Sequence, residues 1–228
     1  MRVSSPDAAG RLTRADGRRN REALLFQAIE LMAERGPAVP LDEIARAAGV
    51  GNATLYRHFP DRAALLRAIA AQVIGLSAQA AEQALDEEED SFEALARYMR
   101  EAIRMRVSWV MPAIASVIDP NDKHLNQLRQ RSTDAIIALI ANAQRDGALR
   151  PDLTFGDVGL LLVRLSRPLP PGQAQETQDA VAQRHLSIVL AGLRSGPDPL
   201  PASGLNLADL RRLGPKPFVN GNLGPADP

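Results

Sequence analysis

Apolar residues recur along most of the chain every three or four positions, which is the spacing of amphipathic α-helices. No stretch of useful length alternates between polar and apolar residues as a half-buried β-strand would. Glycine and proline interrupt the pattern at Gly36-Pro37, Gly49 and Gly147, where helices are expected to end. The pattern therefore predicts an all-α fold. The expected helices cover residues 19–35, 41–48, 52–59, 61–85, 92–111, 125–145, 154–166 and 173–193.

Both ends of the chain lack this pattern. Residues 1–18 are polar and contain glycine, so a flexible arm is expected there. From Ser195 onward Gly and Pro recur every few residues, and only the stretch "LNLADLRRL" could form a helical turn or two. We therefore expect residues 195–228 to be a linker-like tail that contributes little to the core.

Composition limits the class of protein more than its function. The 228 residues are 45% hydrophobic and 24% charged, with a net charge of zero, as in an ordinary globular protein. Cysteine is absent, which excludes a disulfide framework and suits a reducing cytoplasm. The longest apolar stretch, residues 107–118, is too short to cross a bilayer, and the basic N-terminus lacks the apolar core of a secretory signal. We therefore expect a cytoplasmic protein that does not enter the membrane.

Two short helices joined by a glycine-containing turn lie between Leu41 and Phe59, in the pattern of a helix-turn-helix. Ala45 is small enough for a close helix crossing, and Gly49 allows the left-handed backbone that such a turn requires. Apolar residues on both helices can face inward, which leaves a polar face on the second helix. This is the geometry of a recognition helix that enters the major groove of DNA. The outward or flanking residues are Gly51, Asn52, Ala53, Thr54, Tyr56, Arg57 and His58.

The stretch "AGVGNATLYRHFPDRAALL" resembles the signature of the TetR family of one-component transcriptional regulators, and the resemblance covers about residues 20–75. It implies that Tyr56 and His58 contact the DNA backbone. It also implies a phosphate contact for Arg62, where the family usually has Lys. Base reading varies between members at the positions of Gly51, Asn52, Ala53 and Arg57. The chain departs from the family where Pro40 replaces a usual Thr and where Gly51 and Ala53 replace Ser and Gly, so a hydroxyl–phosphate contact and a side-chain cap are missing.

The charge distribution agrees with a DNA-binding N-terminal region. Residues 1–21 hold six arginines and two aspartates in a chain whose net charge is zero. Basic segments next to a helix-turn-helix can reach DNA, and Arg19 is the candidate here. Such a cluster can equally serve only to keep the chain soluble.

The resemblance implies that the long remainder binds a small molecule and dimerises. The expected domains are a basic arm (1–18), a helix-turn-helix domain (19–60), a helical ligand-binding and dimerisation domain (61–194) and the tail (195–228). The helix over 61–85 is expected to be the element that joins the two functions. Ordinary core packing is the alternative for each ligand candidate. These candidates are Tyr98, Met99, Arg104, Met105, Trp109, Met111 and His124.

The last two helices are the expected dimer interface, because their apolar faces are wider than one core needs. Gly159, Ala182 and Gly192 would allow two copies to approach closely. The alternative is that both helices simply cover the ligand domain. The candidate interface residues are Phe155, Val158, Leu161, Leu162, Leu165, Val181, Ile188, Val189 and Leu193.

Other functions find little support. The three histidines are far apart and lack metal-spaced partners, and no nucleophile, phosphate-loop or zinc-hydrolase motif is present. We therefore expect no catalysis, metal or cofactor. The partners expected are a palindromic operator in double-stranded DNA, an unknown small-molecule effector and a second copy of the chain, in a repressor released by the effector. The alternative is a helical adaptor that docks a protein without DNA specificity.

Overall fold

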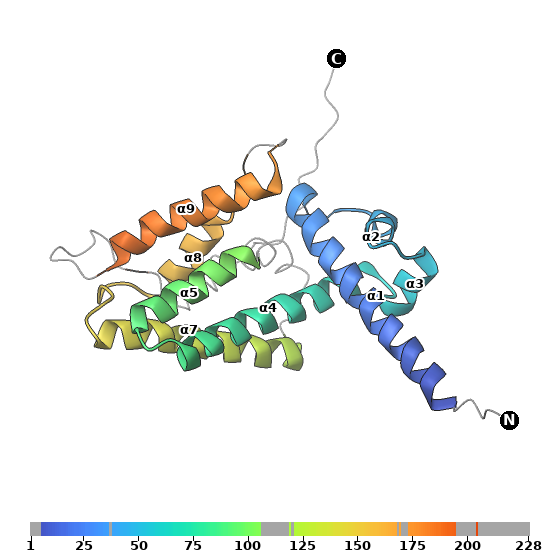
Figure 1. The fold of residues 1–228 in the computed structure, drawn as a ribbon, viewed down its shortest axis with the longest axis horizontal. Helices are drawn as coiled ribbons and strands as arrows, with labels where there is room; N and C mark the ends of the chain where they lie inside the picture. Colours follow the sequence, from blue (N-terminus) through green and yellow to red (C-terminus); the bar gives the residue numbers. More distant parts are fainter. Residues whose placement is uncertain are drawn as a thin grey trace, which may run out of the picture.

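The computed structural model describes residues 6–36, 38–105, 119, 121–167, 169, 173–194 and 204. These residues are helical, as the sequence predicted, and Figure 1 shows a small group of helices joined to a larger bundle. Within the described part of the chain, β-structure is limited to one isolated bridge between Leu149 and Arg194. The helices are α1 (Pro6–Arg35), α2 (Leu41–Ala47), α3 (Asn52–His58), α4 (Arg62–Glu87), α5 (Ser91–Arg104), α7 (Lys123–Arg145), α8 (Phe155–Leu165) and α9 (Gln175–Leu193).

Two expected boundaries were wrong. The first helix begins at Pro6, within the segment expected to be a flexible arm through residue 18. Isolated glycines cost a helix only about 1 kcal/mol each, and pairs such as Arg19 with Asp16, three residues apart, support the helix there. At the other discrepancy, α5 ends at Arg104, although the pattern continued to residue 111.

The helices enclose two separate cores. The first belongs to what we call the head, which comprises α1–α3 and the N-terminal half of α4; its deepest residues include Leu24, Ile44 and Phe59. The second belongs to the body, which comprises the rest of α4 with α5, α7, α8 and α9. The head core continues along α4 as far as Ile74, beyond the boundary expected after residue 60, because α4 is too apolar on this side to end the core at its first turn.

Helix α7 also reaches the head core. Leu125, in the first turn of α7, is completely buried in the cluster that holds the head together. The sequence had suggested that the long fourth helix alone joins the head to the body, and the structure corrects this. The head is attached through α4 and α7 together.

Helices α4 and α7 lie side by side and run in the same direction (Figure 1). Arg67 pairs with Asp122 near the head, and Arg131 Nε donates to Glu82 Oε1 at 2.5 Å further along. Between these pairs, a Cβ on Gly75 would lie 3.9 Å from Leu128 Cδ2. These contacts fix the register between the two helices.

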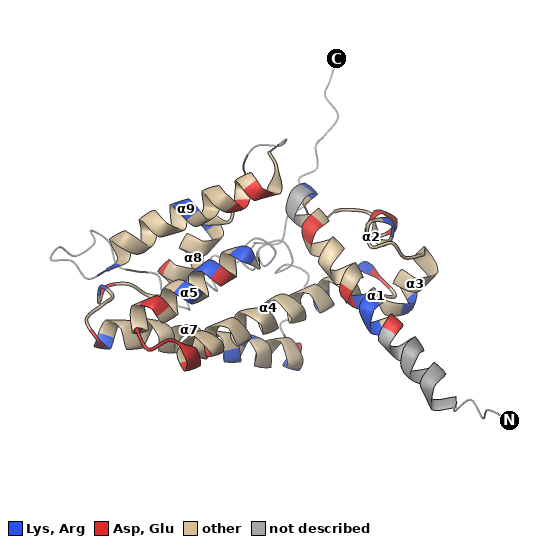
Figure 2. Cartoon of the chain, in the orientation of Figure 1, with Lys and Arg blue, Asp and Glu red and all other residues tan. Residues whose placement is uncertain are grey.

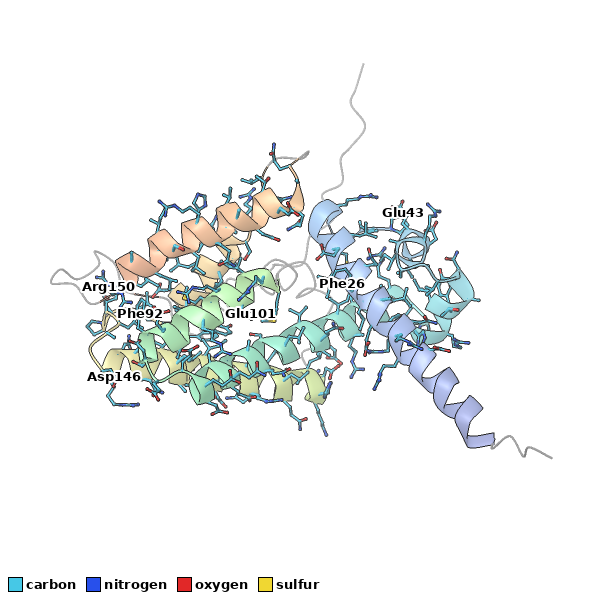
Figure 3. All side chains as sticks on the ribbon, viewed as in Figure 1. Phe26, Glu43, Phe92, Glu101, Asp146 and Arg150 are labelled. Carbon is cyan, nitrogen blue, oxygen red and sulfur yellow. The ribbon has the colours of Figure 1, made fainter. Side chains whose placement is uncertain are left out.

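At the far end of the body, the C-terminal end of α9 contacts both α5 and the loop between α7 and α8. The Arg194 guanidinium carbon lies 4.1 Å from the centre of the Phe92 ring, and the Arg150 backbone N–H donates to the Leu193 carbonyl at 3.2 Å. Figure 3 shows Phe92 and Arg150 together at the end of the body remote from α3. The N-cap carboxylate of Asp90 accepts hydrogen bonds from the Phe92 and Glu93 backbone N–H groups at 2.9 Å and so caps α5.

One tail residue is described, and it lies against α8. A Cβ on Gly204 would lie 2.5 Å from Thr154 Cγ2 and would also overlap Asp157. Thr154 and Asp157 form the capping box that begins α8. The tail therefore returns to the body at this point.

Among the described helices, α4 is long and apolar enough to cross a membrane, with a mean hydropathy of 1.4 over its best window. The longest apolar stretch of the sequence, residues 107–118, lies entirely outside the described part. Half of the α4 window is buried inside the protein. Because α4 supplies residues to both cores, packing explains its apolar composition.

Candidate nucleic-acid interface

Glycine at the end of α2 sets the angle between α2 and α3. Gly49 has φ of 68°, the left-handed conformation expected from the sequence. The Val50 N–H then donates to the Ala45 carbonyl at 3.0 Å, which closes the turn. Gly51 is the N-cap residue of α3 and makes no side-chain cap, which confirms the missing cap expected from the sequence. Pro40 is the N-cap residue of α2 and also makes no side-chain cap.

The inner faces of the two helices are apolar, as predicted. Ile44 and Ala45 of α2 are fully buried. Leu55 of α3 and Phe59, the C-cap residue of α3, are at most 2% exposed. This packing anchors α3 against α1 and α4 and determines which side of α3 faces out. The remaining face of α3 is therefore rigidly presented.

The outer face of α3 holds the residues predicted to contact DNA. Gly51, Asn52, Ala53, Tyr56 and Arg57 are exposed, with Tyr56 at 52%. Thr54 and His58 are half-buried at the edges. The structure therefore gathers all seven residues on one helix, and it places small residues at the end where a close approach to a surface needs them.

Arg62 has a structural role that the sequence did not reveal. It is the first residue of α4, and its guanidinium donates to the backbone carbonyl of Val39, just before α2. Asp61 caps the same helix by accepting from the Ala64 N–H at 2.7 Å. Arg62 therefore ties the start of α4 to the start of α2, and any phosphate contact would use its other N–H groups.

His58 has an unusual environment. Its Nε2 atom is buried and has no hydrogen-bond partner among the described residues. Burial lowers the pKa of the imidazole, and the positive charges of Arg57 and Arg21 lower it further. Arg21, from α1, lies over the Phe59 ring with its guanidinium carbon 5.5 Å from the ring centre. Arg21 was missed at the sequence level because nothing in a run of arginines shows which one faces α3.

Figure 2 shows basic residues where α1 meets α3. Arg19, the basic residue predicted to reach DNA, is exposed on α1 and is paired with Asp16. Its neighbour Arg18 lies 3.9 Å from Glu22. In the described chain these pairs partly neutralise the expected basic arm.

The structure divides the predicted ligand residues. Tyr98 and Met99 are buried in the body core. Arg104 is exposed and pairs with Glu101 at 2.7 Å, so it gives no sign of an anionic ligand. Met105 is half-buried and His124 is exposed at the start of α7. Trp109 and Met111 lie outside the described residues.

A chain of buried hydroxyl groups accompanies Tyr98. Its hydroxyl lies 3.2 Å from Ser77 Oγ of α4, which lies 3.1 Å from Ser132 Oγ of α7. Burial raises the pKa of Tyr98 to about 12, so the phenol stays neutral. Both serines were missed at the sequence level, although a serine on an apolar helix face indicates a buried hydrogen bond. The described residues contain no group of three His, Asp or Glu side chains able to hold a metal.

Three of the predicted interface residues also belong to the core of the protomer. Val158, Leu162 and Leu193 are buried within the body's own core at 7% exposure or less, which is the alternative that the sequence left open for these helices. The helices turn these residues inward because α8 and α9 must also cover α5. The others stay partly accessible: Phe155, Leu161, Leu165, Val181 and Val189 are half-buried, and Ile188 is 57% exposed.

The outer face of α9 contains an open, mostly apolar hollow. Ile188 lies one turn beyond it on the same helix. Leu186 and Leu190, on the opposite side, pack into the body core. The hollow is lined by Glu176, Thr177, Ala180, Val181, Arg184 and His185.

A helix-turn-helix head with an exposed recognition helix, joined to a helical body, defines a DNA-binding regulator of the one-component type. A family model described as bacterial regulatory proteins of the tetR family matches residues 24–69, and one described as the C-terminal domain of SbtR-like transcriptional regulators matches residues 90–195. The chain belongs to the TetR family of transcriptional regulators, a family of regulators and not of enzymes.

Two relatives are transcriptional repressors. KstR2 of Rhodococcus jostii is 30% identical over 207 residues, which are 84% of this chain and 98% of KstR2. LfrR of Mycolicibacterium smegmatis is 46% identical over 66 residues, which are 29% of this chain and 34% of LfrR. The protein is accordingly a DNA-binding transcriptional repressor.

Solved structures agree with this assignment. The regulator SCO0520 of Streptomyces coelicolor is 30% identical, with a TM-score of 0.56 over 78% of this chain and 99% of that one. LfrR of Mycobacterium smegmatis, solved in complex with proflavine, is 26% identical, with a TM-score of 0.55 over 80% of this chain and 98% of that one.

Proposed function

We propose that this repressor binds a palindromic operator as a homodimer, with the exposed face of α3 in the major groove of each half-site. The observation that supports this most directly is the single rigid face that carries Asn52, Tyr56 and Arg57. Tyr56 and Arg62 hold the backbone, while Asn52 and Arg57 read bases. Thr54 and His58 contact phosphate at the edges of the groove, and Gly51 and Ala53 let the backbone come close.

The exposed outer face of α9 supports the homodimer. Val181 and Ile188 lie along it, and Glu176 and Arg184 give it charges of both signs, which suits a self-complementary two-fold interface. Leu161, Leu165 and Phe155 of α8 extend the same surface. Two heads in one dimer read two half-sites about 34 Å apart, which gives the selectivity that one head lacks.

A small, uncharged and largely apolar effector is the ligand that fits the body. LfrR of Mycobacterium smegmatis was solved in complex with proflavine, which supports a small-molecule effector for this family. In this chain the neutral hydroxyl chain through Tyr98, Ser77 and Ser132 offers hydrogen bonds but no charge. Effector binding near these residues moves α4 and α7 together and changes the spacing of the heads. This works only if the effector binds the DNA-incompetent arrangement more tightly.

The test compares two duplexes, an operator selected from random sequence by the protein itself and a scrambled version of it. Tyr56→Ala should weaken binding to both duplexes alike, because a backbone contact is independent of sequence. Arg57→Ala should lose preference at particular base pairs, by about 1–3 kcal/mol for each lost contact. Equal losses on both duplexes for Arg57→Ala would remove it from base reading.

The same titration separates repression from the adaptor alternative. A DNA-binding head should hold random duplex with an affinity that falls steeply as salt rises. A protein-docking head should show no such binding. We also propose that the protein acts in the cytoplasm, where the operator lies, and that it needs no metal, cofactor or catalytic step.

A further inference from the structure

Three basic side chains meet where α1 packs against α3. Arg21 of α1 lies over the Phe59 ring, with its guanidinium carbon 5.5 Å from the ring centre. The imidazole of His58 lies on the same ring, with 6.2 Å between the two ring centres. Arg57 precedes His58 at the exposed end of α3. The buried Phe59 thus positions a guanidinium from one helix beside an imidazole from another.

No carboxylate among the described residues neutralises this cluster. Neither Arg21 nor Arg57 has an ion pair within the described chain, and both are exposed. The positive charge of these two residues is therefore directed to solvent at the edge of the recognition face. The other head arginines whose side chains the structure describes have partners. These pairs are Arg18 with Glu22, Arg19 with Asp16, Arg35 with Glu43, Arg46 with Asp42, Arg67 with Asp122 and Arg62 with the Val39 carbonyl.

The cluster leaves His58 without compensation. Its Nε2 atom is buried with no partner in the described structure, and the charged groups acting on the ring are both cations, Arg57 from α3 and Arg21 from α1. From α4, Asp61 is used to cap the helix and Arg62 to hold Val39. Burial lowers the pKa of the imidazole most, and the two cations lower it further. An anion placed beside Arg21 would offset this repulsion and raise the pKa of His58.

We infer that Arg21 and His58 together bind one phosphate of the DNA backbone, next to the base-reading Arg57, and that His58 takes up a proton when this phosphate binds. Guanidinium groups match phosphate oxygens in a forked geometry, and this site lies on the same helix as the exposed Tyr56. Arg21 is then a DNA-contacting residue supplied by α1. The inference rests on the proposed DNA binding but adds a residue and a proton to it.

The first experiment measures the contribution of Arg21. Fluorescence anisotropy on a random-sequence duplex is recorded over a range of salt concentrations for the wild type, Arg21→Gln and Arg35→Gln. The control, Arg35, lies at the other end of α1, about 20 Å away by helical rise. Arg21→Gln should weaken binding about tenfold at low salt and reduce the salt slope by about one for each head. Arg35→Gln should match the wild type.

The second experiment follows the proton. At fixed salt, wild-type affinity for the duplex should rise as the pH falls from about 8 to 5.5, by up to tenfold per pH unit for each proton taken up. His58→Gln should remove this dependence, because the other two histidines lie in the body on α7 and α9. Calorimetry of the wild type in buffers of different ionisation enthalpy counts the proton without any substitution.

The outcomes are distinct. An unchanged salt slope in Arg21→Gln overturns the phosphate site, and a binding reaction that takes up no proton overturns the role of His58. Failure of the wild type to bind any duplex at low salt overturns the proposed function together with this inference. Thermal melting of each variant confirms that the head is folded, and a second variant, His58→Asn, replaces His58→Gln if that variant does not fold.

Discussion

Arg67 on α4 forms an ion pair with Asp122, the residue that caps α7. The Asp122 side chain also accepts a hydrogen bond at 3.1 Å from the N–H of Leu125, the leucine that enters the head core. One carboxylate thus joins the head end of α4 to the start of α7. This arrangement makes the α4–α7 pair the mechanical link between body and head.

The first prediction concerns this link. Asp122→Asn keeps a good helix cap but removes the charge, so the ends of α4 and α7 near the head should separate more easily. We expect faster amide hydrogen exchange in Leu65–Ile74 and in the first turn of α7. The matched control is Glu82→Gln, which removes the Arg131 pair further along the same two helices. Exchange in the head that is equally fast in both variants would contradict the link.

The same carboxylate gives a pH prediction. The Arg67 guanidinium, together with the Leu125 N–H, lowers the pKa of Asp122 to about 2. A lowered pKa contributes stability above the ordinary value of an aspartate, and this contribution is lost as the pH falls toward the lowered value. The difference in melting temperature between the wild type and Asp122→Asn should therefore be constant near pH 7 and shrink between about pH 4 and pH 2. A difference in melting temperature that grows as the pH falls would contradict this prediction.

The buried hydroxyl chain should contribute modestly to stability. Tyr98→Phe removes one end of the chain and leaves Ser77 bonded to Ser132. We expect the free energy of unfolding in urea to fall by about 1 kcal/mol. Affinity for random duplex should stay unchanged, because Tyr98 lies in the body core. A loss of DNA binding without an effector would show that this chain sets the resting position of the heads.

The difference in burial along the last two helices predicts opposite behaviour for core and surface variants. Leu162→Ala should lower the free energy of unfolding by about 2–5 kcal/mol, because it creates a cavity in the body core. Val181→Glu combined with Ile188→Glu should leave the protomer folded and shift sedimentation toward the monomer. Ile137→Glu, at an exposed apolar residue on α7, is the control and should remain dimeric. A double mutant that sediments as a dimer would place the interface elsewhere.

Gly204 makes the tail testable. Its contact with the capping box of α8 predicts that removal of residues 195–228 lowers the melting temperature by a few degrees. Removal of residues 205–228 alone should not, because Gly204 is retained. Replacing Gly204 by Val should reproduce the larger deletion, since a side chain there collides with Thr154. Equal melting temperatures for all three variants would show that the tail contributes nothing to α8.

The sequence by itself determined the all-α fold, the turn at Gly49 and the polar face of α3. These features are local: helical periodicity, a left-handed glycine and the order of seven residues on one short helix are all written within a few turns of chain. The same holds for the Asp90 cap. Helix ends were less certain than these features, since the pattern placed neither the start of α1 nor the end of α5 correctly.

Tertiary structure decided which apolar face is buried and which charges meet. Periodicity shows that Leu162 and Ile188 lie on apolar stripes, but only packing against α5 buries the first and leaves the second exposed. Arg21 approaches His58, Asp122 meets Arg67, and Leu125 enters the head core. The first pair is 37 positions apart in the sequence and the second 55, and they meet because helices far apart in sequence cross there. Such contacts depend on the angles between helices, which the sequence specifies only through the whole core.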